Sequence, residues 1–259
     1  MTANAVMSAN SSENPNVLDP LARVRIVLVE PSHPGNIGAS ARAMKAMGLS
    51  DLALVKPREF PSAAATARAS GADDILVRAK CYDSLQSAIA TCGIVIGTTA
   101  RERHLEWPVV APREMAEWLA PRAADADCAL VFGREQAGLS NAEMALCHRM
   151  VRIPTSAHFS SLNLAQAVQI CVYELRNAVV VAPALVARAD EPLATTAELA
   201  SALDHLQTVM IKVDFFNPAH PRLLPIRLQR LLNRSELKRS EVQILRGFLT
   251  AIEETLAEP

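Results

Sequence analysis

The chain has 259 residues and a net charge of −1, and half of its residues are hydrophobic while only 4% are aromatic. At roughly 100–200 residues per domain, this length predicts one large domain or a domain with an appendage. The near-neutral charge excludes a globally basic nucleic-acid binder but is compatible with a local basic patch. A core that is rich in aliphatic residues and poor in aromatic ones is typical of α/β layering.

The N-terminal segment, residues 1–20, has neither a basic start nor an apolar run. We therefore expect a disordered tail rather than a signal peptide. No apolar run approaches the roughly 20 residues of a membrane span. The five cysteines form no C-x-x-C pair, so we expect buried thiols in a reducing cytoplasm and neither a disulfide framework nor a zinc site.

Residues 21–182 are expected to form one α/β domain. Short β-branched runs alternate with helical patterns there, which predicts a parallel sheet covered on both faces. The expected strands are 24–29, 52–55, 74–77, 93–98, 128–132 and 150–153, and the expected helices are 37–47, 84–90, 112–119, 141–147 and 162–181. In the first helix we expect Asn36 as the N-cap, Ile37, Ala41 and Met44 on the buried face, and Gly48 at the end.

The composition changes after this domain. Residues 183–194 contain two prolines and are expected to be a linker. Only helical patterns follow, at 197–210, 222–233 and 240–256, so residues 195–259 are expected to form a small all-α domain.

This helical region carries a local basic excess. Between Lys212 and Arg246 there are eight Lys or Arg residues against three Asp or Glu residues. Arg227, Arg230 and Arg234 are spaced to form one stripe, opposite a face expected to hold Leu224, Leu228 and Leu231. A solvated helix face is the plain interpretation of the stripe, and contact with nucleic-acid phosphates is the functional one.

Four polar segments follow predicted strands, where ligands bind in open α/β sheets. They are "EPSHPGNIGASAR", "GTTARERH", "GREQAGLS" and "IPTSAHFSSLNLAQA". The first lacks the spacing of a dinucleotide or P-loop motif, and no G-x-S-x-G nucleophile elbow is present. The glycines, among them Gly133, could serve only tight turns, and Ser160, Ser161 and Asn163 could be ordinary first residues of a helix.

Together, however, "PGNIGASARAMKAMG", "FGREQAGLS" and "SSLNLAQAVQI" resemble, in order and spacing, the three motifs of the SpoU branch of the SPOUT RNA methyltransferases. Further along, "RLQRLLNRSELKRSEVQILRGFL" resembles the helical C-terminal region of tRNA 2′-O-methyltransferases of this kind. The resemblance covers about residues 23–252.

The resemblance implies a parallel sheet with a deep C-terminal trefoil knot, a homodimer, and S-adenosylmethionine as the cofactor, with no metal. Its loops would hold the cofactor, with Gly133 allowing close backbone approach. The implied cofactor-binding residues are Thr98, Thr99, Ala100, Gly133, Ile153, Ser160, Ser161 and Leu162.

The implied reaction is methylation of the ribose 2′-hydroxyl at position 32 of tRNA, on cytidine, uridine or both. The implied catalytic residues are Arg42, Asn36, Glu135 and Asn163. A guanidinium group stays protonated in proteins, so we expect Arg42 to bind the hydroxyl and its phosphate, and the final proton acceptor is left open. The implied RNA contacts are Arg101, Arg103, Arg227, Arg230 and Arg234. The alternatives are an rRNA 2′-O-methyltransferase and a catalytically silent RNA-binding protein.

Overall fold

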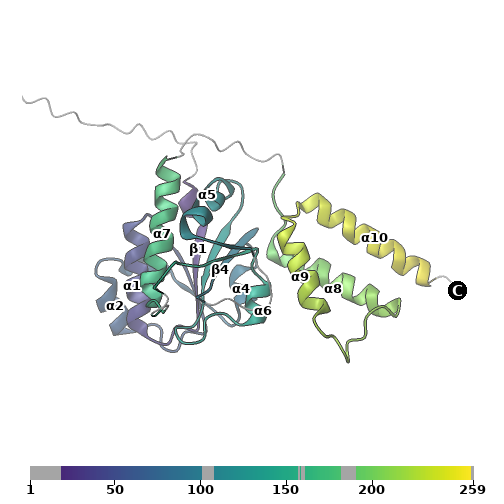
Figure 1. Cartoon of the computed structure of the whole chain (residues 1–259), viewed down its shortest axis with the longest axis horizontal. Helices are drawn as coiled ribbons and strands as arrows, with labels where there is room; N and C mark the ends of the chain where they lie inside the picture. The colour runs from purple at the N-terminus through teal and green to yellow at the C-terminus, as the bar shows by residue number, and fades with distance from the viewer. Residues whose placement is uncertain (1–18, 101–107, 157, 159–160, 182–190, 258–259) are drawn as a thin grey trace, which may run out of the picture.

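A computed structural model of the chain describes residues 19–100, 108–156, 158, 161–181 and 191–257 (Figure 1). Its centre is a seven-stranded sheet in the order β3-β2-β1-β6-β4-β7-β5, and every pairing in it is parallel. This confirms the α/β class with a parallel sheet. The strands are β1 Val24–Val29, β2 Asp51–Val55, β3 Lys80–Tyr82, β4 Ile94–Thr98, β5 Val109–Val110, β6 Cys128–Phe132 and β7 Arg149–Val151.

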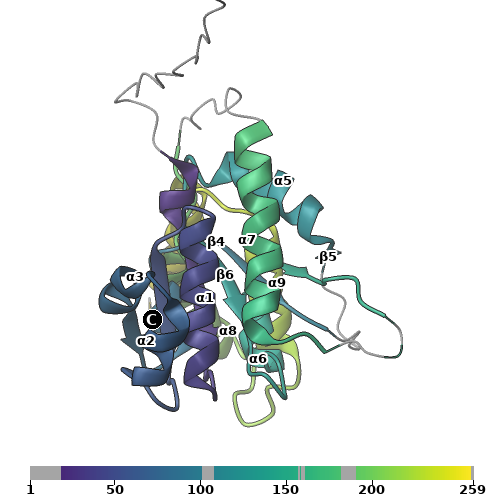
Figure 2. The ribbon, with the colours of Figure 1, turned by 90° about the vertical axis from the view of Figure 1, so that its left-hand side faces the viewer.

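Successive side chains of the central strands enter two different cores, because a strand alternates its faces. Ile26 and Leu130 lie in one buried cluster, whereas the next residues, Val27 and Val131, lie in the other. The first cluster is covered by α1 (Pro34–Ala46), α2 (Ala63–Ala69), α3 (Asp73–Arg78), α5 (Pro112–Arg122) and α7 (Leu164–Val181). The second is covered by α4 (Leu85–Ile89) and α6 (Asn141–Ala145) (Figures 1 and 2).

One expected strand was wrong. The run at 74–77 is not a strand but lies in α3. Asp73 and Asp74 occupy the first turn of this helix, where their negative charges interact favourably with the positive end of the helix dipole. Ile75 and Leu76 are buried while Val77 is 84% exposed, so the run buries one side of a helix and lacks the burial on both faces of a central strand. The neighbouring edge strand is β3, and β5 and α2 were also not predicted.

The first helix begins earlier than expected. Pro34 starts α1, and His33 rather than Asn36 is its N-cap, with Nδ1 accepting a hydrogen bond from the Gly35 amide. Proline is favoured in the first turn because its missing N–H has no helical partner there. The expected buried face of Ile37, Ala41 and Met44 is confirmed.

The C-terminal region is helical, as expected, with α8 (Thr196–Lys212), α9 (Leu224–Arg234) and α10 (Arg239–Ala257). It packs against the second face of the sheet domain beside α4 and α6 (Figure 1). Part of the expected linker, residues 182–190, lies outside the described residues, and the end of it joins this region through the Leu193–Lys238 bridge.

Hydrogen bonds at two helix ends fix this arrangement. Ala197 in the first turn of α8 donates its amide to the carbonyl of Ala90, the C-cap of α4, at 3.1 Å. The buried Asn233 donates from Nδ2 to the Ala145 carbonyl at the end of α6, at 2.8 Å. Both contacts satisfy carbonyls that a helix leaves without internal partners.

The apolar face of α9 differs from the expected one. Leu231 is exposed, while Leu232 and the buried Asn233 lie on the side packed toward the sheet domain. The reason is that α9 is oriented by Asn233 and Ile226 against α6 and its neighbours, which the leucine spacing alone does not reveal. Arg227 and Arg234 are exposed, whereas Arg230 is only partly so. Across the described residues, no helix is both long and apolar enough to cross a membrane.

Candidate active site

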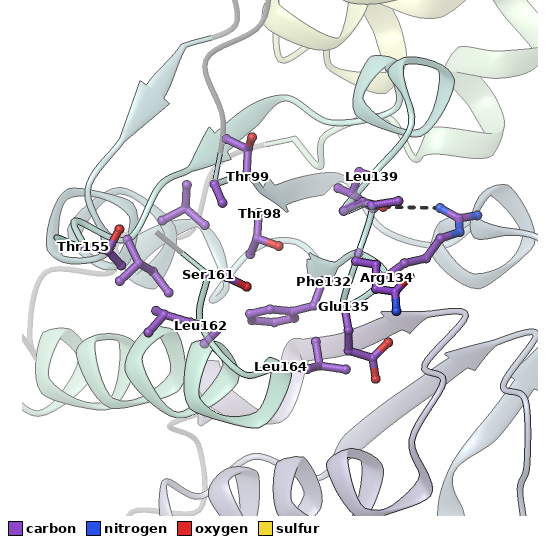
Figure 3. A pocket seen from close by; sticks show the side chains of 18 of the residues that line it. Thr98, Thr99, Phe132, Arg134, Glu135, Leu139, Thr155, Ser161, Leu162 and Leu164 are labelled. Atoms are coloured by element: carbon purple, nitrogen blue, oxygen red, sulfur yellow. Dashed lines mark hydrogen bonds between the residues drawn. The ribbon is translucent and has the colours of Figure 1, made fainter. Parts of the chain in front are cut away.

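A cavity lies at the carboxyl ends of β4, β6 and β7 (Figure 3). It is lined by loops that are far apart in the sequence but adjacent in space because their strands are neighbours. Seven of the eight expected cofactor-binding residues line it: Thr98, Thr99, Ala100, Gly133, Ile153, Ser161 and Leu162. The eighth, Ser160, lies outside the described residues.

Both apolar and polar side chains face this cavity. Ile153 lines it with an apolar side chain. Figure 3 shows two further apolar side chains, Leu139 and Leu162, and the hydroxyl groups of Thr98 and Ser161. The Thr99 amide is fixed by a hydrogen bond of 3.0 Å to the Val151 carbonyl, which ties the β4 loop to the end of β7. Such a mixture of apolar surface and a few polar groups is typical of small-molecule sites.

Gly133 lies at a tight turn of the backbone. A Cβ added to this residue would lie 2.3 Å from the Gly138 carbonyl carbon and 2.5 Å from the Leu139 amide nitrogen. The loop that follows β6 therefore folds back on itself so tightly that only glycine fits at its start. The tight turn accounts for a glycine at this position, and because Gly133 also lines the cavity, its expected contact with the cofactor stays a prediction.

Glu135 is held by donors from the segment that follows β1, the strand beside β6 in the sheet. Its carboxylate accepts hydrogen bonds from the Ser32 amide (3.1 Å) and from Nδ2 of Asn36 (3.1 Å). Partial burial opposes ionisation, but the Asn36 and Ser32 hydrogen bonds outweigh it and hold the pKa of Glu135 below its ordinary value. Glu135 is therefore a carboxylate at neutral pH.

The same network includes Asn163. Its Nδ2 donates to Oδ1 of Asn36 at 2.9 Å, and its own Oδ1 accepts from the Ala165 amide at the start of α7. Three of the four expected catalytic residues, Glu135, Asn36 and Asn163, thus form one hydrogen-bonded chain at the edge of the cavity. Each comes from a different motif, and no local pattern in the sequence indicates that they touch.

Arg134 holds the loop after β6 in place. Its guanidinium forms a two-pronged ion pair with Glu30 at the end of β1 and a second one with Glu143 of α6. These hydrogen bonds raise the pKa of Arg134 and lower that of Glu30, and at Glu143 they outweigh burial and lower the pKa as well. In Figure 3 the Arg134 side chain points away from the cavity, and its dashed hydrogen bond to the Gly138 carbonyl closes the loop. Arg134 therefore shapes the loop, a role that was not predicted from the sequence.

Arg42 is exposed on α1 and does not line the cavity. It follows Asn36 by six residues, a rise of about 9 Å along the helix, and it projects from a different side of the helix. Within the described residues, no hydrogen bond or ion pair engages its guanidinium. The structure of one chain thus leaves Arg42 apart from the other expected catalytic residues.

The remaining expectations concern RNA and metal. Arg101 and Arg103 lie outside the described residues. Arg227, Arg230 and Arg234 lie on α9, in the helical region. In the described part of the chain, no group of three or more His, Cys, Asp or Glu side chains is arranged to hold a metal ion. Four of the five cysteines are buried free thiols, and Cys81 is exposed.

Several residues that line the cavity were not predicted from the sequence. They include Phe132, Leu139, Met144 and Thr155. Phe132 and Leu139 flank the "GREQAG" loop, so their place next to a family motif was the signal that could have found them. Met144 had no such signal, because it reaches the cavity from α6 through the packing of that helix.

Comparisons with known proteins match both parts of the chain. The model of the SpoU rRNA methylase family matches residues 23–173, and the model of the C-terminal domain of the tRNA methyltransferase TrmJ matches residues 197–259. The tRNA (cytidine/uridine/adenosine-2′-O-)-methyltransferase TrmJ of Pseudomonas aeruginosa is 47% identical, over 89% of this chain and 93% of its own length. The tRNA (cytidine/uridine-2′-O-)-methyltransferase TrmJ of Sodalis glossinidius is also 47% identical, over 91% and 93%. The crystal structure of TrmJ from Z. mobilis aligns with a TM-score of 0.79 and 35% identity, over 88% of this chain and 98% of that one.

Proposed function

This chain belongs to the SpoU rRNA methylase family, and from that membership we propose that it transfers a methyl group from S-adenosylmethionine to a ribose 2′-hydroxyl of tRNA. The proposed target is position 32, in the anticodon loop. The names of the relatives include cytidine, uridine and, in one case, adenosine as the methylated nucleoside. A tRNA substrate is favoured over rRNA because the helical region matches the TrmJ C-terminal domain.

One observation carries this proposal. Seven of the eight residues expected to bind the cofactor line one cavity, and the Glu135–Asn36–Asn163 network lies at its edge. Three motifs spread over more than a hundred residues thus form a single site. A protein that retained only the fold would have no need to keep this network of polar groups, so the alternative of a silent RNA-binding protein is disfavoured.

The cavity fits S-adenosylmethionine. Leu139, Ile153 and Leu162 offer apolar contact for the adenine ring, and loop amides and the hydroxyls of Thr98 and Ser161 offer polar contacts. When bound, this cofactor supplies an electrophilic methyl group. Glu135 is ionised at the edge of the cavity, and its negative charge would favour a positively charged ligand there.

The protein's own residues align the acceptor. We assign to Arg42 the binding of the ribose hydroxyl and the adjoining phosphate, since a guanidinium matches phosphate oxygens with two parallel hydrogen bonds. Asn36 and Asn163 would hold the network in one arrangement, with Glu135 as its anchor. Holding the reactants in this way raises the rate, because their translational and rotational entropy is lost on binding and no longer adds to the barrier of the chemical step.

The proposed active form is a homodimer. Arg42 lies outside the cavity of its own chain, so a second copy is needed to complete a site that uses both. The sheet domain also has exposed apolar side chains on α7, namely Tyr173 and Val180, which support a protein contact there. The deep trefoil knot implied by the family remains a prediction, and so does action in the cytoplasm.

The experiment is methylation by the purified protein. A tRNA transcript with cytidine 32 should gain one 2′-O-methyl group per molecule, detected by nucleoside mass spectrometry, and a transcript that already carries this methyl should gain none. EDTA should not reduce the rate. A methyl group found at another position, or only on rRNA fragments, would contradict the assignment of substrate. In a deletion strain, the same nucleoside should be missing from total tRNA.

A further inference from the structure

The loop between α8 and α9, residues 213–223, carries an exposed aromatic side chain on a backbone that hydrogen bonds fix to the end of α8. α8 ends in a Schellman turn: Asp214 adopts a left-handed conformation (φ 59°), and the Phe215 amide donates to the Met210 carbonyl at 2.9 Å. The residue in the position of Phe215 usually packs back on such a helix end. Here Phe215 is 70% exposed, and the next residue, Phe216, is buried instead.

Two exposed cations lie on the same loop and on the helix that follows it, Arg222 in the loop and Arg227 in the first turn of α9. Neither Arg222 nor Arg227 has a hydrogen bond or ion pair from its guanidinium within the described residues. Lys212, by contrast, is paired with Glu253 at 2.7 Å. Asp214 is the one acidic residue in the sequence between positions 211 and 227. The segment that carries the ring therefore has a net positive charge, since its one acidic residue stands against Lys212, Arg222 and Arg227.

This surface lies at the same end of the molecule as the cavity. In Figures 1 and 2, which share a vertical axis, the loop extends to the lower end, where α1 and α7 begin. The carboxyl ends of the strands, and hence the cavity, are at this end as well. The contact between Asn233 and the Ala145 carbonyl fixes α9, and with it the loop, to the sheet domain.

We propose that the surface formed by Phe215, Arg222 and Arg227 binds the tRNA substrate, with one unpaired base stacked on the Phe215 ring and backbone phosphates on the two arginines. The inference rests on the proposed function. Stacking on an exposed aromatic and charge contact with phosphates are the usual means by which proteins hold nucleotides that are not in a duplex. Of the basic stripe on α9, this surface includes Arg227 but neither Arg230 nor Arg234. It adds Arg222 and an aromatic ring to that residue.

The first experiment compares Phe215→Ala with Phe248→Ala in the full-length protein. Phe248 on α10 is also exposed, at 64%, so its loss controls for the removal of a surface phenyl group. With an unmodified tRNA transcript at one salt concentration, Phe215→Ala should raise Kd about tenfold, within the range for loss of one base–aromatic stack. Phe248→Ala should leave Kd unchanged, and both variants should keep wild-type S-adenosylmethionine affinity and melting temperature.

Phe215→Trp tests stacking directly. It should restore most of the affinity, and tRNA should quench its emission beyond the change seen in the wild type, which has Trp107 and Trp118. Equal Kd for Phe215→Ala and the wild type would overturn the inference. So would a Phe215→Ala protein that binds tRNA normally but shows altered self-association in sedimentation, because the ring would then be a protein contact. A wild-type protein that fails to bind any tRNA would overturn the proposed function itself.

The arginines are tested by salt dependence. An Arg222→Gln, Arg227→Gln double variant should bind tRNA more weakly, because each guanidinium that pairs with a phosphate displaces counterions from the RNA. The slope of log K against log salt should become shallower by roughly 0.7–0.9 for each phosphate that the variant no longer neutralises. An unchanged slope would remove both arginines from the interface.

Discussion

Asn163, at the start of α7, donates a hydrogen bond of 2.9 Å to Oδ1 of Asn36 in the first turn of α1, and the two residues are 127 positions apart in the sequence. Because the amide oxygen of Asn36 is engaged in this way, its amide nitrogen faces Glu135. One contact thus fixes the orientation of the whole network.

We expect Asn163→Asp to break this orientation. The aspartate has the same shape but places an acceptor opposite the Asn36 oxygen, so the Asn36 amide is driven to turn and lose its hydrogen bond to Glu135. The single-turnover methylation rate should fall roughly tenfold to a hundredfold, as expected for misaligned reacting groups. A double-mutant cycle with Asn36→Ala measures the coupling, and additive effects of the two changes would contradict a shared role.

The Arg42→Ala variant should have a lower kcat than the wild type and an unchanged free energy of unfolding. Arg42 is exposed and off the buried face of α1, so its removal creates no cavity. The loss of one positioned group that acts in the transition state should lower kcat roughly a hundredfold or more. Arg42→Lys should recover little, because an ammonium group does not reproduce the two-pronged geometry. Arg113→Ala, another exposed arginine, is the control, and a folded Arg42→Ala protein with the wild-type rate would remove Arg42 from the mechanism.

Gly133→Ala should destabilise the protein, because the new methyl group would overlap the Gly138 backbone. We expect a loss of about 1–3 kcal/mol in the free energy of unfolding, as for other forced overpacking. Gly247→Ala is the matched control: a Cβ there meets no atom within 4 Å, and a helical alanine should be neutral or stabilising. If Gly133→Ala instead kept full stability and lost only cofactor affinity, the glycine would be serving close approach of the cofactor.

His148 should make the fold sensitive to acid. It is buried, its Nδ1 accepts a hydrogen bond of 3.1 Å from the Val95 amide, and burial lowers its pKa to about 4. Since the folded pKa lies below the unfolded value of 6.5, the unfolded chain binds the proton more readily. The contribution of neutral His148 to the free energy of unfolding is complete above about pH 6.5 and is lost as the pH falls toward 4. We expect the free energy of unfolding to fall by about 2 kcal/mol between pH 7.5 and pH 5.

Chemical denaturation at these two pH values measures the effect. His148→Asn keeps an acceptor for the Val95 amide but does not titrate in this range, so it should be less stable at neutral pH and show a flatter dependence. An unchanged pH dependence in His148→Asn would assign the acid sensitivity to other groups.

The sequence alone determined the parallel sheet, the helical C-terminal region and the segments that form the cavity. Continuous apolar strands such as 128–132 mark a sheet buried on both faces, and the polar motifs after them mark its carboxyl edge. These features are local, so a single stretch of chain carries the information. The error at 74–77 has the same origin, since a short apolar run suits a strand and a helix equally well.

Only the tertiary structure decided which residues meet. Three sets of contacts join positions that are distant in sequence. They are the hydrogen bonds among Glu135, Asn36 and Asn163, the ion pairs of Arg134 with Glu30 and Glu143, and the hydrogen bond from Asn233 that orients α9. Such contacts depend on the order of strands in the sheet and on how the two parts of the chain pack, and no local pattern encodes either. The same holds for the two adjacent phenylalanines of the loop after α8. Phe215 is exposed and Phe216 is buried, and the sequence gives no sign of which one faces water.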